Sequence, residues 1–206
     1  MSRKNLEIRL SQLVKPFTEP NIDFEQYQTP PRVAANLLHL AWTRDDIEGK
    51  HVVDLCAGTG ILGIGAALLG ADVTLVEKDP DAFSQLQQNL EALDVGVTVT
   101  AVNEDVLSWH SDDTFDTAIL NPPFGIQQKS VRDMDFIRRA APIAEVIYSI
   151  HDGSPKNQRR LPGLFKKYQL KIIESYLEEF PLDRSYPWHS MKRKIHEVLI
   201  IHSARL

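Results

Sequence analysis

The fold class is indicated by the residues His51-Val52-Val53-Asp54-Leu55-Cys56-Ala57-Gly58-Thr59-Gly60-Ile61-Leu62-Gly63. A short apolar run leads into a turn with two glycines, and a run rich in Ala, Leu, Ile and Gly then continues to about residue 69. This pattern predicts a buried strand, a tight turn and a helix, as in nucleotide-binding α/β folds. Gly58, Gly60 and Gly63 fit G-x-G-x-x-G, where glycines allow the backbone to approach a ligand closely.

A second strand is expected from Asp72 to Glu77, where four apolar or β-prone residues precede an acid. Glu77 lies 19 positions after Gly58, close to the ~20 expected for a carboxylate that binds ribose hydroxyls. The alternative is an acid near a helix with no ligand. Asp79 and Pro80 are suited to the N-cap and first turn of the next helix.

The remaining patterns complete an alternation of helices and strands. Helices are predicted over residues 5–14, 31–42, 79–93 and 133–144, and from residue 154 with a break at Pro162-Gly163; strands are predicted over residues 97–102, 115–120, 145–150, 169–180 and 194–204. The last two strands are too close in sequence for a parallel crossover. We therefore predict an α/β fold with a doubly wound, mostly parallel seven-stranded sheet that ends in an antiparallel strand pair.

The chain length of 206 residues fits one domain, with residues 1–30 and 151–206 as parts of it. Cys56 is the single cysteine, which excludes an internal disulfide and is typical of a reducing, cytoplasmic protein. No apolar run reaches the ~20 residues of a membrane span, so no membrane association is expected. His151 has no second histidine or cysteine at ligand spacing, so no metal is expected.

The charge is unevenly distributed along the chain. Residues 1–150 carry 12 Lys and Arg against 22 Asp and Glu, whereas residues 151–206 carry 11 against 6. The basic side chains near the C-terminus include Arg159, Arg160, Lys166, Lys167, Lys192, Arg193 and Lys194. A basic end on an acidic body indicates a contact with a polyanion, or alternatively a set of solvated surface charges.

The chemistry is indicated by Ile119-Leu120-Asn121-Pro122-Pro123-Phe124. A strand cannot continue through two prolines, so Asn121 is placed where a buried strand ends and a cleft begins. The Asn121 side-chain carbonyl and the Pro122 backbone carbonyl are two acceptors for a planar NH2 group, and Phe124 offers a ring for stacking. The alternative is a rigid end to the strand. With the glycine turn upstream, the pattern favours methyl transfer to a conjugated amino nitrogen.

Two cofactor classes share the strand–glycine turn–helix–strand–acid pattern. A nicotinamide-dependent dehydrogenase would bind a pyrophosphate at the turn, where the Asp54 carboxylate would repel it. That carboxylate instead suits the amino group of S-adenosylmethionine. A dehydrogenase also has no evident use for Asn121 to Phe124 and usually needs a further substrate domain.

Asp54 to Gly60 together with Asn121 to Phe124 resembles the class I methyltransferases that modify amino nitrogens. Over nearly the whole chain the sequence is similar to the methyltransferase-like protein 5 family of archaea and eukaryotes. The matching motifs are Glu25-Gln26-Tyr27-x-Thr29-x-Pro31, Asn121-Pro-Pro-Phe-Gly125, Asp133-Met134-Asp135-Phe136 and Tyr148-Ser149-Ile150-His151.

The resemblance implies formation of N6-methyladenosine in small-subunit ribosomal RNA, with S-adenosylmethionine as cofactor. It implies that cofactor contacts come from Gln26, Tyr27, Thr29, Asp54, Cys56, Gly58, Thr59, Gly60, Ile61, Glu77, Asp105, Val106 and Asn121, and that Asn121, Pro122, Pro123 and Phe124 hold the target base. Asp105 and Val106 would contact the adenine, unless Asp105 is only a loop acid. Many relatives have a more glycine-rich turn where this chain has Cys56. The cysteine side chain leaves less room for a cofactor to approach the backbone there. Residues 125–131 are a candidate lid.

The resemblance also implies a partner, a small zinc-containing activator of the Trm112 type. The expected strand order puts residues 97–102 at a sheet edge, and this strand lacks the lysine or proline that usually protects an edge. A partner strand would cover it, unless the protein's own loop does.

Two other functions fit the same residues. A glutamine N5-methyltransferase acting on a protein also binds a conjugated NH2, with Tyr where this chain has Phe124. The basic C-terminal part favours RNA. A binding-only scaffold is the remaining alternative, and the presence of Asn121 and Glu77 argues against it.

Overall fold

The computed structural model describes residues 1–21, 24–124, 133–182 and 194–206. The helices are α1 (Arg3–Leu13), α2 (Pro31–Thr43), α3 (Ile61–Leu68), α4 (Pro80–Glu91), α5 (Asp133–Ala140) and α6 (Pro155–Lys167). The strands are β1 (His51–Leu55), β2 (Asp72–Glu77), β3 (Val99–Asn103), β4 (Phe115–Leu120), β5 (Ala144–Asp152), β6 (Leu170–Leu182) and β7 (Lys194–Arg205).

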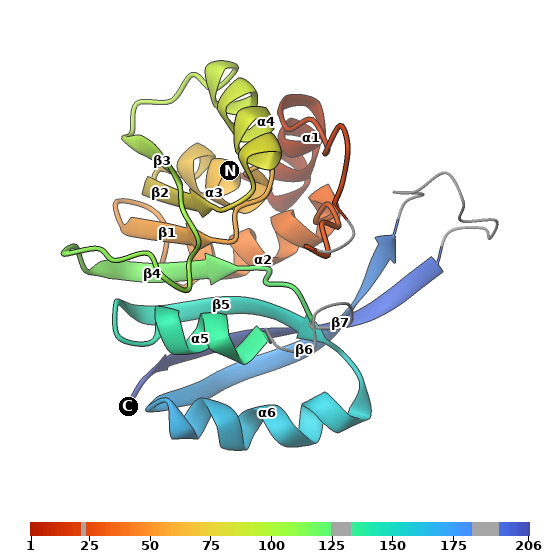
Figure 1. Ribbon diagram of the computed structural model, residues 1–206, viewed down its shortest axis with the longest axis vertical. Coiled ribbons are helices and arrows are strands. Elements are labelled where there is room, and N and C mark those ends of the chain that lie inside the picture. The colour runs from red at the N-terminus through yellow and green to blue at the C-terminus, as the bar shows by residue number, and fades with distance from the viewer. Residues whose placement is uncertain (22–23, 125–132, 183–193) are drawn as a thin grey trace.

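The strands form one seven-stranded sheet in the order β3-β2-β1-β4-β5-β7-β6. β1 to β5 are parallel, whereas β7 runs antiparallel to both β5 and β6. Figure 1 shows β3 at one end of the sheet and the β6–β7 hairpin at the other. The predicted fold class is therefore confirmed, including the antiparallel C-terminal pair and the edge position of the third strand.

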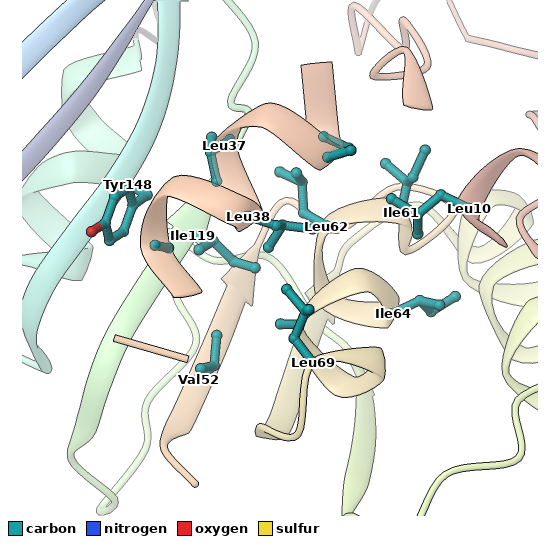
Figure 2. Close-up of a cluster of buried hydrophobic side chains, with 14 of the residues drawn as sticks. Leu10, Leu37, Leu38, Val52, Ile61, Leu62, Ile64, Leu69, Ile119 and Tyr148 are labelled. Carbon is teal, nitrogen blue, oxygen red and sulfur yellow. The ribbon is translucent and has the colours of Figure 1, made fainter. Parts of the chain in front are cut away.

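Helices cover both faces of the sheet (Figure 1). On one face, α2 and α3 pack on the strands, α1 packs on these two helices, and α4 lies over β2 and β3. On the other face, α5 and α6 pack with residues of β1, β4, β5 and β7 in a second apolar cluster. Figure 2 shows the first cluster, in which side chains of α1, α2 and α3 meet residues of the sheet: Leu10, Leu37, Leu38, Val52, Ile61, Leu62, Ile64, Leu69, Ile119 and Tyr148.

The turn between β1 and α3 requires glycine at Gly60. Its φ of 91° lies in the left-handed region, which a side chain disfavours. A Cβ on Gly60 would also lie 2.4 Å from Cδ1 of Leu86. The turn is anchored to the neighbouring strand because the backbone N–H groups of Cys56 and Ala57 both donate to the carbonyl of Val76.

The element bounds agree with the prediction to within two residues except at one helix. The helix predicted over residues 133–144 ends at Ala140, two residues before Pro142, which disfavours helical backbone in the residue before it. The third strand begins at Val99 rather than at residue 97. The predicted break at Pro162-Gly163 is wrong, since α6 is continuous through both residues. Proline costs the helix one backbone hydrogen bond there, while Leu161 and Phe165 are fully buried and keep α6 packed on the sheet.

Across the described parts of the chain, the helices are all too short or too polar to cross a lipid bilayer.

Candidate active site

A cavity of about 280 Å³ lies at the carboxyl ends of the parallel strands. Most of the residues predicted for the site line it: Gln26, Tyr27, Thr29, Cys56, Gly58, Thr59, Ile61, Glu77, Asp105, Val106, Asn121, Pro122, Pro123 and Phe124. They come from the ends of four neighbouring strands and from the segment before α2. Asp54 and Gly60 are the two predicted residues that do not line the cavity.

Glu77 connects the end of β2 to the glycine turn. Its Oε2 accepts from the backbone N–H of Gly58 at 2.7 Å, and its Oε1 accepts from the backbone N–H of Asp79 at 2.9 Å. Burial raises the pKa of this carboxyl, against the lowering effect of these two hydrogen bonds. Each oxygen keeps a second lone pair, so the carboxylate can hold the turn and accept from hydroxyl groups in the cavity.

Asp54 lies beneath the turn, where it is fully buried. Its Oδ2 accepts from the backbone N–H of Gly63 at 2.7 Å, which braces the first turn of α3. Its Oδ1 is buried with no hydrogen-bond partner among the described residues. Burial raises the pKa of Asp54 to about 7, and the nearby Glu77 carboxylate adds to the rise. Asp54 therefore supports the cofactor turn from below rather than forming the cavity wall.

Cys56 has a φ of 68°, an uncommon left-handed conformation for a residue with a side chain. Burial raises the pKa of its thiol well above the ordinary value, and the carboxylates of Glu77 and Asp54 add to this effect. The thiol is therefore protonated at neutral pH, and Cys56 is a lining residue rather than a nucleophile.

Asn121 projects from the end of β4 toward the segment before α2. Its Nδ2 donates to Oγ1 of Thr29 at 2.9 Å. Three positions further on, the backbone N–H of Phe124 donates to Oε2 of Glu25 at 2.8 Å. With its amide nitrogen bound to Thr29, Asn121 has its carbonyl oxygen as the acceptor for an incoming amino group.

Several residues that line the cavity were not predicted as site residues: Phe17, Phe24, Glu25, Gln28, Ala57, Leu62, Lys78, Phe136, Phe180 and His196. Lys78 lies over the ring of Phe24, with Nζ 4.3 Å from its centroid. His196 stacks on Phe124 with ring centroids 6.0 Å apart, and it contacts Oδ1 of Asp152 at 3.0 Å. Glu25 belongs to the motif Glu25-Gln26-Tyr27-x-Thr29, whereas Gln28 occupies its unspecified position. No local pattern signalled His196, which β7 brings to the site.

His151 lies outside the cavity lining and is fully buried. Its Nδ1 lies 2.7 Å from Oδ2 of Asp133, and its Nε2 lies 2.9 Å from Oγ of Ser149. Burial opposes ionisation of Asp133, but contacts with His151 and Arg160 outweigh it and lower the pKa of that carboxyl. These bonds join the start of α5 to the end of β5, so His151 is structural.

Apart from Lys194, the first residue of β7, the basic residues named near the C-terminus fall into three groups. Arg160 is used within the protein, 3.7 Å from Asp133. Arg159, Lys166 and Lys167 are exposed on α6. Lys192 and Arg193, like the candidate lid at 125–131, lie outside the described residues. Among the described residues of the chain, no three His, Cys, Asp or Glu side chains form a cluster that could hold a metal ion.

The chain matches a family model described as Conserved hypothetical protein 95 over residues 32–172. It is 36% identical to the rRNA N(6)-adenosine-methyltransferase METTL5 of Danio rerio, over 93% of each chain. A proposed RNA methyltransferase from Pyrococcus horikoshii has a crystal structure similar to this one, with a TM-score of 0.89, 35% identity and coverage of 99% of this chain and 98% of that one.

A more distant structure shares the fold alone. Magnesium protoporphyrin IX methyltransferase from Synechocystis, solved with S-adenosylmethionine bound, has a TM-score of 0.65 at 17% identity, covering 85% of this chain and 79% of that one. The chain therefore belongs to the Conserved hypothetical protein 95 family and to the METTL5-type rRNA N(6)-adenosine methyltransferases.

Proposed function

We infer that this protein transfers a methyl group from S-adenosylmethionine to N6 of an adenosine in ribosomal RNA. The observation that carries this inference is the geometry of Asn121, which follows the end of β4. Its amide nitrogen donates a hydrogen bond to Oγ1 of Thr29. Its carbonyl oxygen and the Pro122 carbonyl then form a pair of acceptors suited to an exocyclic NH2. The full-length METTL5 relatives support rRNA adenosine as the source of that NH2.

The cavity fits S-adenosylmethionine, which when bound supplies an electrophilic methyl group on a positively charged sulfur. Glu77 presents two carboxylate oxygens where ribose hydroxyls would bind, and apolar side chains such as Ile61 and Val106 suit a flat adenine. The negative charges of Glu77 and Asp105 suit a cationic cofactor. Asp54 lies beneath the turn and would stabilise it, although its Oδ1 has no hydrogen-bond partner among the described residues.

The protein's contribution to the reaction is mainly positioning. The target base leaves its stack in the RNA and enters the cavity beside Phe124. Asn121 and Pro122 would accept hydrogen bonds from N6 and draw its lone pair out of conjugation, so that N6 could bond to the methyl group as the bond between that methyl and the cofactor's sulfur breaks. No strong base is needed, because the nitrogen becomes acidic once the methyl group has transferred.

We propose the small-subunit ribosomal RNA as the substrate. Exposed Arg159, Lys166 and Lys167 on α6 give this end of the sheet a positive surface, which suits phosphate contacts. We propose a cytoplasmic location, which fits the single cysteine of the chain.

We also propose a small zinc-containing activator of the Trm112 type as a partner at β3. Among the described strands, β3 pairs with β2 alone and carries exposed Thr100 in its centre. Strand addition by a partner would satisfy its outer backbone groups.

The partner's position is tested by co-purification of this chain with the activator. Thr100→Lys puts a charge on the β3 edge and is expected to reduce co-purification. Ser175→Lys, the same kind of change at the exposed centre of β6 on the opposite edge, is the matched control and should not. Loss of the activator only with Ser175→Lys would place the partner at the wrong edge and refute this proposal.

The substrate is tested with labelled S-adenosylmethionine and three acceptors: small-subunit RNA, large-subunit RNA and release-factor protein. Label in small-subunit RNA alone is expected. Label in large-subunit RNA would overturn the subunit assignment, and label on protein glutamine would favour the alternative glutamine N5-methyltransferase.

A further inference from the structure

Residues 25–29, which we call the strap, lie between the cofactor side and the base side of the cavity. All five of them line it. Glu25 and Thr29 contact the loop after β4, whereas Gln26 and Gln28 contact the loops after β2 and β1.

On the base side, the strap holds two points of the loop that follows β4. Thr29 Oγ1 accepts from Nδ2 of Asn121 at 2.9 Å, and Glu25 Oε2 accepts from the backbone N–H of Phe124 at 2.8 Å. The first bond sets the rotation of the Asn121 amide. The second sets the backbone from which the Phe124 ring projects. Thr29 and Glu25 are both buried, so water does not compete freely for these bonds.

On the cofactor side, the strap holds the two loops that would surround the cofactor. Gln26 Nε2 donates to Oδ2 of Asp79 at 2.5 Å. The hydroxyl of Thr59 donates to Oε1 of Gln28 at 2.8 Å. Asp79 in turn donates from its backbone to Glu77, so the strap reaches the predicted ribose-binding carboxylate through one residue.

The two ends of the strap differ in stiffness. Thr29 directly precedes Pro30 and the start of α2, and proline restricts the residue before it to extended backbone. Glu25 instead has a φ of 51°, a left-handed conformation that is strained for a residue with a side chain. Its conformation therefore depends on the bonds that it and its neighbours make.

We propose that the strap couples the two halves of the site, with Thr29 and Glu25 as positioning residues that orient Asn121 and Phe124. This inference rests on the proposed function. A bound cofactor would hold the loops at Thr59 and Asp79, and these loops hold the strap. The strap then holds the amide and the ring that receive the base. A bound cofactor would therefore stabilise the strap bonds that orient the acceptor pair.

The first test removes the Thr29 oxygen while keeping the shape of the side chain. Thr29→Val is expected to lower kcat about 10- to 100-fold with little change in the affinity for S-adenosylhomocysteine, measured by calorimetry. Thr29→Ser keeps the oxygen and should restore most of kcat. The control is Thr18→Val, since Thr18 bonds Gln85 rather than the loop after β4.

The double variant Thr29→Val/Asn121→Ala tests whether the two residues act as one unit. If Thr29 acts through Asn121, its substitution has no further effect once Asn121 is gone. Independent, multiplying losses would overturn the proposed role of Thr29. A loss of cofactor affinity equal to the loss of kcat would also overturn it, because a merely structural strap predicts that result.

The second test needs no methyl transfer. Hydrogen exchange at the Phe124 amide should slow when S-adenosylhomocysteine binds, because the closed strap keeps the Glu25 acceptor in place. Glu25→Ala should abolish this slowing, and Glu25→Gln, which keeps an acceptor oxygen, should preserve it. Unchanged exchange on cofactor binding would overturn the coupling. If wild-type protein methylates a different acceptor, the substrate assignment fails while this exchange test still decides the role of the strap.

Discussion

Asn121 and Thr29, 92 positions apart in the chain, are joined by a 2.9 Å hydrogen bond from Nδ2 to Oγ1. The bond leaves one defined atom of the Asn121 side chain, the carbonyl oxygen, to accept from a substrate. It also places the segment before α2 in the same small site as the end of β4. The reactive geometry therefore depends on a residue far from the motif that carries the chemistry.

Asn121→Ala is expected to lower kcat by at least about 100-fold, because the variant loses an acceptor that acts on the reacting nitrogen. The affinity for S-adenosylhomocysteine should change less than about three-fold, since Asn121 lies at the base side of the cavity. Single-turnover transfer and calorimetry measure the two quantities. Equal losses in both would mean that Asn121 acts mainly in cofactor binding.

Glu77→Gln is expected to weaken cofactor binding about 10- to 100-fold, as for loss of one or two hydrogen bonds to a charged group. A glutamine amide has one acceptor oxygen, whereas the Glu77 carboxylate accepts from Gly58 and Asp79 through two. At saturating cofactor kcat should stay near that of the wild type. Glu91→Gln, at an exposed position of α4, is the control. A fall in kcat with unchanged affinity would contradict the assignment of Glu77 to the ribose.

Cys56→Gly should leave the free energy of unfolding unchanged or raise it by up to about 1 kcal/mol. Glycine relieves the left-handed backbone of Cys56 but adds freedom to the unfolded chain, and the two effects oppose one another. Cys56→Val, with a branched Cβ, should instead be destabilised. Urea unfolding measures both variants. A loss of more than about 1 kcal/mol in Cys56→Gly would mean that packing of the thiol outweighs the backbone strain.

Asp54 predicts a specific pH dependence of stability. Its pKa is raised to about 7 in the folded protein, so between about pH 4 and pH 7 the folded state holds a proton that the unfolded state has released. The stability of the wild type should therefore fall as pH rises through this window, by at most about 1.4 kcal/mol per pH unit from this group. Asp54→Asn removes the titration while keeping an acceptor for Gly63.

The comparison uses urea unfolding of both proteins at several pH values between 5 and 8. The free energy of unfolding of the wild type minus that of Asp54→Asn should decrease as pH rises to about 7 and should level off above it. Titrations of other groups cancel in this difference where the substitution leaves them unchanged. Parallel pH profiles would contradict the raised pKa of Asp54.

Local patterns were sufficient to predict the order of the elements and the strand–turn–helix at residues 51–69, because glycine and apolar spacing act over a few residues. They failed where tertiary packing decides. Pro162 was expected to break a helix, but buried Leu161 and Phe165 keep α6 intact. The contact between His196 and Phe124 could not be predicted from the sequence. His196 reaches the cavity only because β7 returns antiparallel beside β5.

The site shows the same division. Most of the predicted residues line one cavity. Those that come from the sheet follow strands whose ends were evident in the sequence, whereas Gln26, Tyr27 and Thr29 come from the segment before α2. Asp54 was expected near the ligand, yet its side chain points under the turn, and strand polarity alone did not distinguish these positions. The bond between Asn121 and Thr29 depends on how α2 packs against the sheet.

We infer that the acceptor atom is N6 of an adenosine in ribosomal RNA. It is tested most directly by digesting the RNA to nucleosides after transfer from labelled S-adenosylmethionine and identifying the labelled species by mass spectrometry. We expect labelled N6-methyladenosine with the wild type and none with Asn121→Ala. Label in another nucleoside, or on protein glutamine with none in RNA, would contradict it.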